Sequence, residues 1–133
     1  MSENLFDLLA ARFPEDRSRP CFILADGREI SYGALETGAA QAAGRLVAEG
    51  VQPGDRVALQ AEKSPEAIMV YLGVLKAGAV FLPLNSAYTE ADGLLAVSLG
   101  FDSFWISGLG IRRTNCHQAP CDKTGKREPG NIP

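Results

Sequence analysis

Three features that would assign a protein class at once are scarce in this sequence: long apolar runs, excess positive charge and paired cysteines. No uninterrupted apolar stretch reaches the ~18 residues that a membrane-spanning helix needs, and acidic residues stand near the N-terminus, where a secretory signal would be basic. The net charge of −3 gives no electrostatic footprint for nucleic acid or an anionic membrane surface. Three cysteines, an odd number at no framework spacing, suit a reducing compartment. We therefore expect a cytoplasmic protein that binds neither nucleic acid nor membrane.

What is present points to an α/β fold, most clearly in the stretch from Pro65 to Tyr88. The 133 residues, 46% of them hydrophobic, allow one domain with a modest core but not a two-domain enzyme. Ser64, Pro65 and Glu66 supply a capping hydroxyl, a first-turn proline and an acid near the positive end of the helix dipole. They predict a mostly buried helix with an apolar face of Ile68, Tyr71, Leu72 and Leu75, ending at Lys76, Ala77 and Gly78.

Strands are predicted on both sides of this helix. The continuous apolar run 79–82, stopped by Pro83, is typical of a strand covered on both faces. Residues 56–60 form a second strand, entered through the turn-like segment 52–55. Strand, helix and strand in this order predict a right-handed parallel βαβ unit, and hence an α/β protein.

The first 50 residues predict two helices and a hairpin. Leu5, Leu8, Leu9 and Phe13 have helical spacing and indicate a short amphipathic helix that packs through these side chains and ends before Pro14. Residues 21–25 and 28–31 flank Asp26-Gly27, which indicates a hairpin with a tight two-residue turn. Ser31 can cap a helix that Gly50 closes, and its alanines would let it lie close to its neighbours. The predicted apolar face of that helix is Leu35, Ala39, Ala42, Ala43, Leu46 and Val47.

The character of the chain changes after about residue 92. Residues 93–110 hold scattered apolar side chains with no sustained period. Residues 111–133 carry a net charge of +3, against −6 for the first 110 residues, and contain no aromatic side chain. Such a segment cannot bury enough apolar surface to offset its chain entropy, so we expect the tail to be disordered.

Several side chains are candidates for chemistry, each with a plainer alternative. Cys116, His117, Cys121 and Asp122 could bind zinc, but a structural site needs four ligands in paired spacings and the chain has one histidine. Cys21 lies in an apolar strand, which favours a small buried hydrophobe over a nucleophile. Lys63 and Lys76 could bind phosphate, but a solvated position beside a helix is favoured for each. Tyr32 and Tyr71 could contact a ligand, but a packing role is favoured for each. Thr124-Gly125-Lys126 lacks the preceding strand and following helix of a phosphate loop. We therefore predict no catalytic, cofactor-binding or metal-binding residue.

Two motifs carry a family resemblance. Residues 30–35, Ile-Ser-Tyr-Gly-Ala-Leu, resemble the first core motif of the AMP-forming acyl-CoA synthetases within the adenylate-forming, or AMP-dependent synthetase and ligase, superfamily. Residues 75–85 resemble the second motif, and residues 54–58 between them look like the strand entry of that family. The resemblance covers about residues 3 to 92 and so implies the N-terminal portion of that fold. Residues 60–67 and 82–89 look most like the malonyl-CoA synthetase branch.

The resemblance implies a two-step ligation. A carboxylate attacks the α-phosphate of ATP to give an acyl-adenylate and pyrophosphate, and the thiol of coenzyme A then displaces AMP. This chemistry needs phosphate-cradling donors, Mg²⁺ and cationic groups. The motifs that supply them in the family do not occur in this sequence: the phosphate loop, the adenine-contacting aromatic, the ribose-binding acid and the catalytic lysine. We therefore expect no bound cofactor and no activity from this chain alone.

The end of the resemblance suggests an origin for the tail. After residue 92 the family continues with Asp/Glu-Tyr-Phe and then an Asp-Ser-x-Pro-like turn, whereas this chain continues Gly-Leu-Leu. With permissive codons, a one-base shift converts both segments to the family pattern. We interpret residues 1–92 as the N-terminal part of the synthetase domain and residues 93–133 as a frameshifted extension, with a genuine divergent tail as the rival.

Two other functions of the chain stay open. It could be a non-catalytic partner that docks on a full-length synthetase through unpaired strand edges, or a small Cys/His metal-binding protein.

Overall fold

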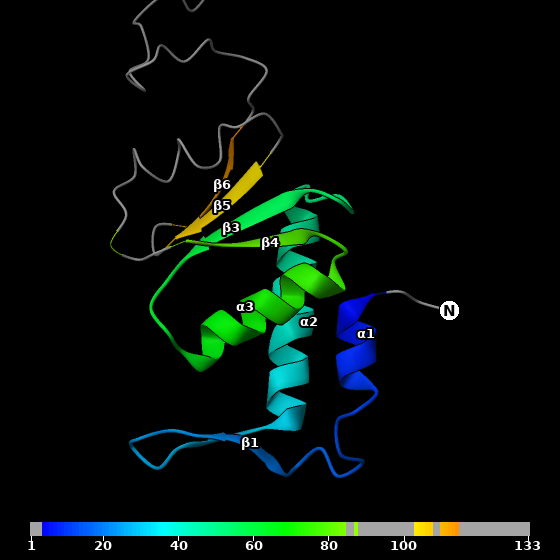
Figure 1. The fold of residues 1–133 in the computed structure, drawn as a ribbon, viewed down its shortest axis with the longest axis vertical. Coiled ribbons are helices and arrows are strands. Elements are labelled where there is room, and N and C mark those ends of the chain that lie inside the picture. Colours follow the sequence, from blue (N-terminus) through cyan, green and yellow to red (C-terminus); the bar gives the residue numbers. More distant parts are fainter. Residues whose placement is uncertain (1–3, 85–86, 88–102, 108–109, 115–133) are drawn as a thin grey trace, which may run out of the picture.

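The chain folds into a helix layer against a four-stranded sheet, with a separate β-hairpin at the far end of the longest helix (Figure 1). The computed structural model describes residues 4–84, 87, 103–107 and 110–114. No helix in these ranges is long and apolar enough to cross a membrane. The predicted α/β class is confirmed. The elements are α1 (Leu5–Ala10), β1 (Pro20–Ile23), β2 (Glu29–Ser31), α2 (Tyr32–Ala48), β3 (Arg56–Gln60), α3 (Pro65–Lys76), β4 (Val80–Leu84), β5 (Ser103–Ser107) and β6 (Gly110–Thr114).

The sheet has the strand order β4-β3-β5-β6 and contains the predicted parallel βαβ unit. Strand β3 pairs in parallel with β4 on one side and with β5 on the other, and its Val57, Ala58 and Leu59 are buried. Strand β4 lies at the edge, where Val80 is 51% exposed. The prediction that this strand is covered on both faces is therefore wrong. The side chains of its continuous apolar run are only partly covered on each face, because an edge strand has a neighbouring strand on one side only.

Strands β5 and β6 were not predicted. They pair antiparallel with each other in the register Ser103↔Thr114 to Ser107↔Gly110. The expectation of a disordered tail is thus wrong for residues 111–114, because a backbone ladder can form without the large apolar side chains that the expectation required. Residues 93–102 and 115–133 lie outside the described ranges. The frameshift origin of residues 93–133 stays a prediction.

The ends of α2 and α3 are set by short local signals, as predicted. The Ala67 N–H donates to Ser64 Oγ (3.1 Å) at the start of α3. At its end the Gly78 N–H donates to Leu75 C=O (3.0 Å) and the Ala79 N–H to Val74 C=O (3.1 Å), with Gly78 at φ +75°. This pairing is a Schellman motif, which stops a helix by a residue in the left-handed region. Helix α2 repeats the design, with Ser31 at its start and Gly50 (φ +96°) past its end.

The core at the sheet end is formed where both helices end. Its fully buried side chains join the two helix ends to β3, and they are Leu46, Val51, Val57, Val74 and Ala79. A Cβ on Gly73 of α3 would come within 2.6 Å of the Ala42 Cβ and 2.9 Å of the Ala39 carbonyl oxygen of α2. The two helices therefore cross in close contact, as the alanine-rich sequence of α2 predicts. Val47 of α2 and Ile68 of α3, both placed on predicted apolar faces, are instead exposed and belong to neither of the buried clusters of the helix layer.

Helix α1 attaches to the helix layer through a different residue from those predicted. Phe6 is 3% exposed and belongs to the cluster of Leu35, Ala39 and Leu72. Of the predicted packing face, Leu5, Leu8 and Leu9 are exposed, whereas Phe13, which follows the helix, packs against this cluster as predicted. The helix has six residues and contacts α3, and Phe6 is its buried residue, in one cluster with Leu72 of α3. The Lys76 Nζ lies 4.5 Å from the centre of the Phe6 ring and covers it with a cation–π contact.

The hairpin β1–β2 is confirmed, with a longer turn than expected. The Gly27 N–H donates to Leu24 C=O (2.9 Å) and the Leu24 N–H to Arg28 C=O (2.8 Å), so three residues, Ala25 to Gly27, form the loop. Gly27 has φ +85°. A type I turn followed by a left-handed glycine is the usual form of a three-residue hairpin loop, and it needs one positive φ angle instead of two.

Candidate functional site

The carboxyl end of β3 is the place where a ligand site is expected in this architecture. In open α/β sheets, ligands bind outside the carboxyl ends of parallel strands. Here β3 ends at Gln60, and the segment 61–64 leads into α3. Gln60 is half-buried and Lys63 is exposed. An amide, an ammonium group and the start of a helix therefore lie within a few residues of one another along the chain.

This surface lacks the groups for phosphoryl chemistry. Ser64 Oγ already accepts a hydrogen bond from the Ala67 N–H and serves as the helix cap. The segment contains one carboxylate, Glu62, and no glycine. Across the described part of the chain, no group of three Cys, His, Asp or Glu side chains could hold a metal ion. Mg²⁺ bound with nucleotide phosphates does not fit the residues described here.

The two tyrosines lie against other aromatic rings, as the packing interpretation predicts. The Tyr32 and Phe13 ring centres are 5.1 Å apart, and the Tyr71 and Phe81 ring centres are 4.8 Å apart in an edge-on arrangement. Tyr71 thereby links α3 to β4. Both rings stabilise packing between elements.

The remaining candidate residues are dispersed. Cys21 is a half-buried free thiol that packs beside the cluster of Phe6 and Leu35. Lys76 contacts Phe6, as described above. Two predicted motifs lie outside the described residues, so the interpretations of their chemistry stay predictions: Cys116, His117, Cys121 and Asp122, and the segment 124–126. The prediction that the chain has no site residues likewise stays a prediction.

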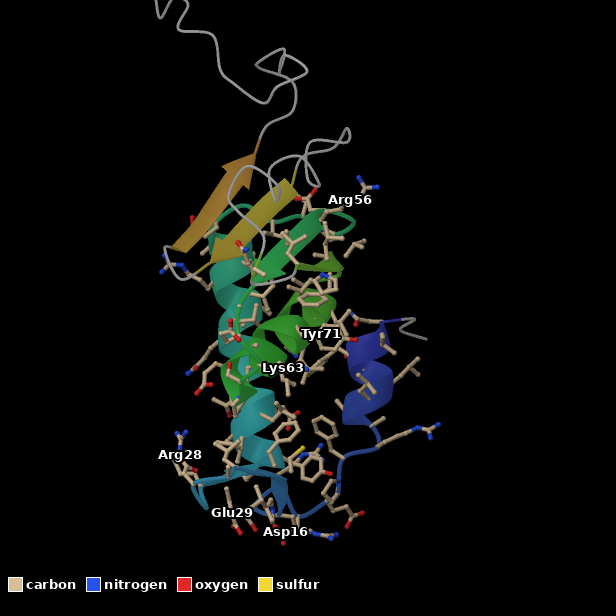
Figure 2. The ribbon with its side chains drawn as sticks, turned by 60° about the vertical axis from the view of Figure 1, so that its left-hand side comes forward. Asp16, Arg28, Glu29, Arg56, Lys63 and Tyr71 are labelled. Carbon is tan, nitrogen blue, oxygen red and sulfur yellow. The ribbon has the colours of Figure 1, made fainter. Side chains whose placement is uncertain are left out.

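The ionisable groups with shifted pKa values sit in turns at the hairpin end of the molecule, opposite Arg56 at the sheet end (Figure 2). Hydrogen bonds from the Ser18 hydroxyl and backbone N–H lower the pKa of Asp16. The pKa of Asp26 is lowered by the backbone N–H of Arg28 and then by its guanidinium, at 2.7 Å, and the same contact raises the pKa of Arg28. All three groups are solvent-exposed and lie in or beside turns. They form no acid–base pair for catalysis.

Gln60 was predicted as the last residue of a strand and as the first residue of the segment 60–67, with no ligand-binding role of its own. The structure places it at the carboxyl end of β3, just before the segment that leads into α3. This end of β3 carries few reactive side chains.

Comparisons with known proteins match this scaffold. A model of the family described as AMP-binding enzyme covers residues 6–96. Nonribosomal peptide synthetase fmqA of Aspergillus fumigatus is 43% identical over 96 residues, with 65% of this chain and 2% of that protein covered. A long-chain-fatty-acid–CoA ligase of Bacillus subtilis (strain 168) is 37% identical over 83 residues, 62% of this chain and 14% of that protein.

Solved structures agree in fold. The crystal structure of ATP-bound MatB from Rhodopseudomonas palustris superposes with a TM-score of 0.66 and 34% identity, over 85% of this chain and 27% of MatB. The chain therefore spans about a quarter of MatB and a smaller share of the two curated relatives. The likeness concerns the N-terminal subdomain of adenylate-forming enzymes.

Proposed function

This chain belongs to the AMP-binding enzyme family, and from that premise we propose that it is the amino-terminal part of an AMP-forming acid–thiol ligase. The observation that carries the proposal is the family match over residues 6–96, together with a shared fold that occupies about a quarter of a larger relative. In such a ligase the part matched here supplies the helix-backed sheet. The groups that act on ATP would come from the rest of the enzyme.

The proposed reaction joins a carboxylic acid to coenzyme A at the expense of ATP. A carboxylate oxygen bonds to the α-phosphorus and pyrophosphate leaves, after which the thiol sulfur bonds to the acyl carbon and AMP leaves. Both steps develop negative charge on phosphate oxygens and need fixed donors around them. The described residues supply no carboxylate cluster for Mg²⁺. We therefore propose that this chain alone is catalytically inactive.

For the acid, we propose malonate or a close analogue. Support comes from the resemblance of residues 60–67 and 82–89 to the malonyl-CoA synthetase branch. The 43% identity to nonribosomal peptide synthetase fmqA, over 96 residues, favours a second candidate, the adenylating part of a peptide synthetase. The two candidates differ in the acid accepted, malonate against an amino acid.

A complementation assay tests this function. The purified chain is mixed with a MatB variant that lacks the matched first quarter, and AMP release from ATP is measured with CoA and either malonate or amino acids. We expect no AMP from either piece alone and malonate-dependent AMP from the mixture. Turnover by the chain alone would contradict the proposed inactivity. Failure of the mixture, with both pieces folded by circular dichroism, would contradict the proposed role as an amino-terminal part.

A non-catalytic docking role is the alternative that one observation supports. Edge strand β4 has an exposed Val80 and leaves one side of its backbone without a strand partner among the described strands. Exposed edges pair readily with other strands. Co-purification of the chain with a full-length synthetase would support docking. A monodisperse monomer in the presence of that synthetase would contradict it.

A further inference from the structure

Strand β4 has one edge that no described strand covers, and the ladder with β3 shows which backbone groups lie along it. In a parallel ladder each residue directs its N–H and C=O to the same side of its strand, and successive residues alternate between the two sides. The Val80 N–H donates to the Asp55 C=O (2.7 Å), on the side of β3. Val80 and Leu82 therefore direct their backbone groups to β3. Phe81 and Pro83 direct theirs to the open edge.

The open edge lacks a hydrogen-bond donor at Pro83. Proline has no backbone N–H, so this edge of β4 presents the N–H and C=O of Phe81 but only the C=O of Pro83. Proline occurs within sheets mainly at edge strands, because its missing donor would interrupt a central ladder. The Pro83 side chain is exposed. A strand that paired with this edge would leave one of its own carbonyl groups opposite Pro83 without a donor.

The proline is the one feature within β4 that opposes pairing at this edge. Charged side chains, β-bulges and very short strands also keep edges unpaired. Strand β4 has five residues, none of them charged, and it pairs with β3 over all five without a bulge. Uncharged apolar segments of this kind pair readily with copies of themselves unless they contain proline. We propose that Pro83 keeps the open edge of β4 from pairing with the same strand of a second copy of this chain.

The size of this effect follows from the geometry of self-pairing. Most dimers of identical chains have two-fold symmetry. When two copies of β4 pair antiparallel about Leu82, Phe81 of each copy lies opposite Pro83 of the other. Each such pair would exchange two hydrogen bonds if residue 83 had an N–H, but proline allows only one. Symmetry doubles the loss, and two hydrogen bonds change a dissociation constant by roughly tenfold to a hundredfold.

Sedimentation equilibrium of the full chain and of Pro83→Ala tests the proposal. Alanine restores the N–H, and its small side chain adds no apolar surface that could itself drive association. We expect Pro83→Ala to self-associate with a dissociation constant about tenfold to a hundredfold lower than that of the unmodified chain. The matched control is Pro53→Ala, which restores an N–H at an exposed proline outside β4 and should leave the dissociation constant unchanged. Equal dissociation constants for Pro83→Ala and the unmodified chain, or an equal gain in both variants, would overturn the proposal.

Amide hydrogen exchange on the unmodified chain gives a second test that needs no substitution. The Phe81 N–H lies at the open edge, whereas the ladder with β3 protects the Leu82 N–H. Relative to their unstructured rates, we expect Phe81 to exchange about tenfold faster than Leu82, measured residue by residue by NMR. Equal protection would show that the edge is already covered, and it would overturn the proposal even if Pro83→Ala failed to fold.

The inference rests on backbone geometry and not on the proposed ligase function, so the AMP assay does not bear on it. It does bear on the docking alternative, because an edge that lacks a donor at Pro83 is a poor template for a strand of a synthetase as well.

Discussion

The two ends of the helix layer hold together in different ways. At the sheet end, Leu46, Val57 and Val74 are each less than 2% exposed and pack where two helices and a strand meet. Farther from the sheet, a second buried cluster of Phe6, Leu35, Ala39 and Leu72 joins α1 to the two helices. Its border is open: Leu8 of α1 is exposed, and a half-exposed Arg17–Glu36 ion pair (3.1 Å) joins the loop before β1 to α2. Exposed ion pairs contribute little to stability, whereas buried aliphatic side chains contribute much. Truncation inside the buried cluster at the sheet end should therefore cost more than truncation at this exposed border.

The largest expected effect comes from truncating a leucine at each end. Leu46→Ala should lower the free energy of unfolding by about 2–5 kcal/mol, because it leaves a cavity in a fully buried cluster. Leu8→Ala, at a side chain 58% exposed, should change it by less than about 0.5 kcal/mol. Urea titration followed by circular dichroism measures both. Similar losses at the two positions would contradict the contrast between the buried cluster at the sheet end and the exposed border of α1.

A smaller change in stability is expected from substituting two glycines within helices, and the two substitutions should have opposite signs. Gly73→Ala should destabilise by about 1–3 kcal/mol, since its Cβ would overlap the Ala42 side chain and the α2 backbone. Gly44→Ala meets nothing within 4 Å and should stabilise by about 0.5–1 kcal/mol through helix propensity. The shift in the midpoint of thermal unfolding shows whether each substitution stabilises or destabilises the chain. If both substitutions stabilised the chain, the close crossing of α2 and α3 would be wrong.

The cap of α3 should have an effect of about 1 kcal/mol. Ser64→Ala removes the acceptor for the Ala67 N–H at the start of the helix. Ser64→Asp restores an acceptor and should recover most of the loss. Chemical denaturation of the three proteins measures the difference. An aspartate variant as unstable as the alanine variant would show that this hydroxyl does not stabilise the helix as a cap.

The smallest effect is electrostatic and lies at the hairpin turn. Because the pKa of Asp26 is lowered in the folded chain, its contribution to stability is present above the ordinary aspartate pKa and is lost as the pH falls through the lowered value. Arg28→Met should return the pKa of Asp26 only part of the way, since the larger cause, the backbone N–H of residue 28, remains. Carboxyl-carbon NMR titration measures this. A full return would assign the shift to the guanidinium alone.

Features that depend on a few neighbouring residues could be predicted from the sequence. The starts of α2 and α3 follow from Ser31 and Ser64, and their ends follow from Gly50 and Gly78, since each signal acts within one helical turn. The parallel pairing of β3 and β4 followed from the order of the elements. These predictions needed no knowledge of what lies beyond the segment itself.

Features that depend on a distant neighbour could not be predicted in the same way. The spacing of Leu5, Leu8 and Leu9 is helical, yet burial of Phe6 is decided by where α3 lies and by the Lys76 side chain over the ring. Val80 belongs to an apolar run, but its exposure follows from the edge position of β4.

For the candidate site, the sequence predicted the family but not the location. The core motifs indicated adenylate-forming enzymes, and the family match confirms that level. The strand that ends at Gln60 was predicted, but its place between β4 and β5 was not, because β5 was not predicted. The acid substrate could not be derived from packing patterns, because these report burial and not the chemistry of a ligand.

The two Schellman motifs have a consequence for the order in which the chain acquires structure during synthesis. Each closes within six residues, from Leu46 to Val51 and from Val74 to Ala79, and each leaves its last residue in the shared core. A nascent chain can complete both stops before β5 has left the ribosome, since they need no partner downstream. Each of these two helices therefore ends through residues of its own segment, independently of the sequence that follows.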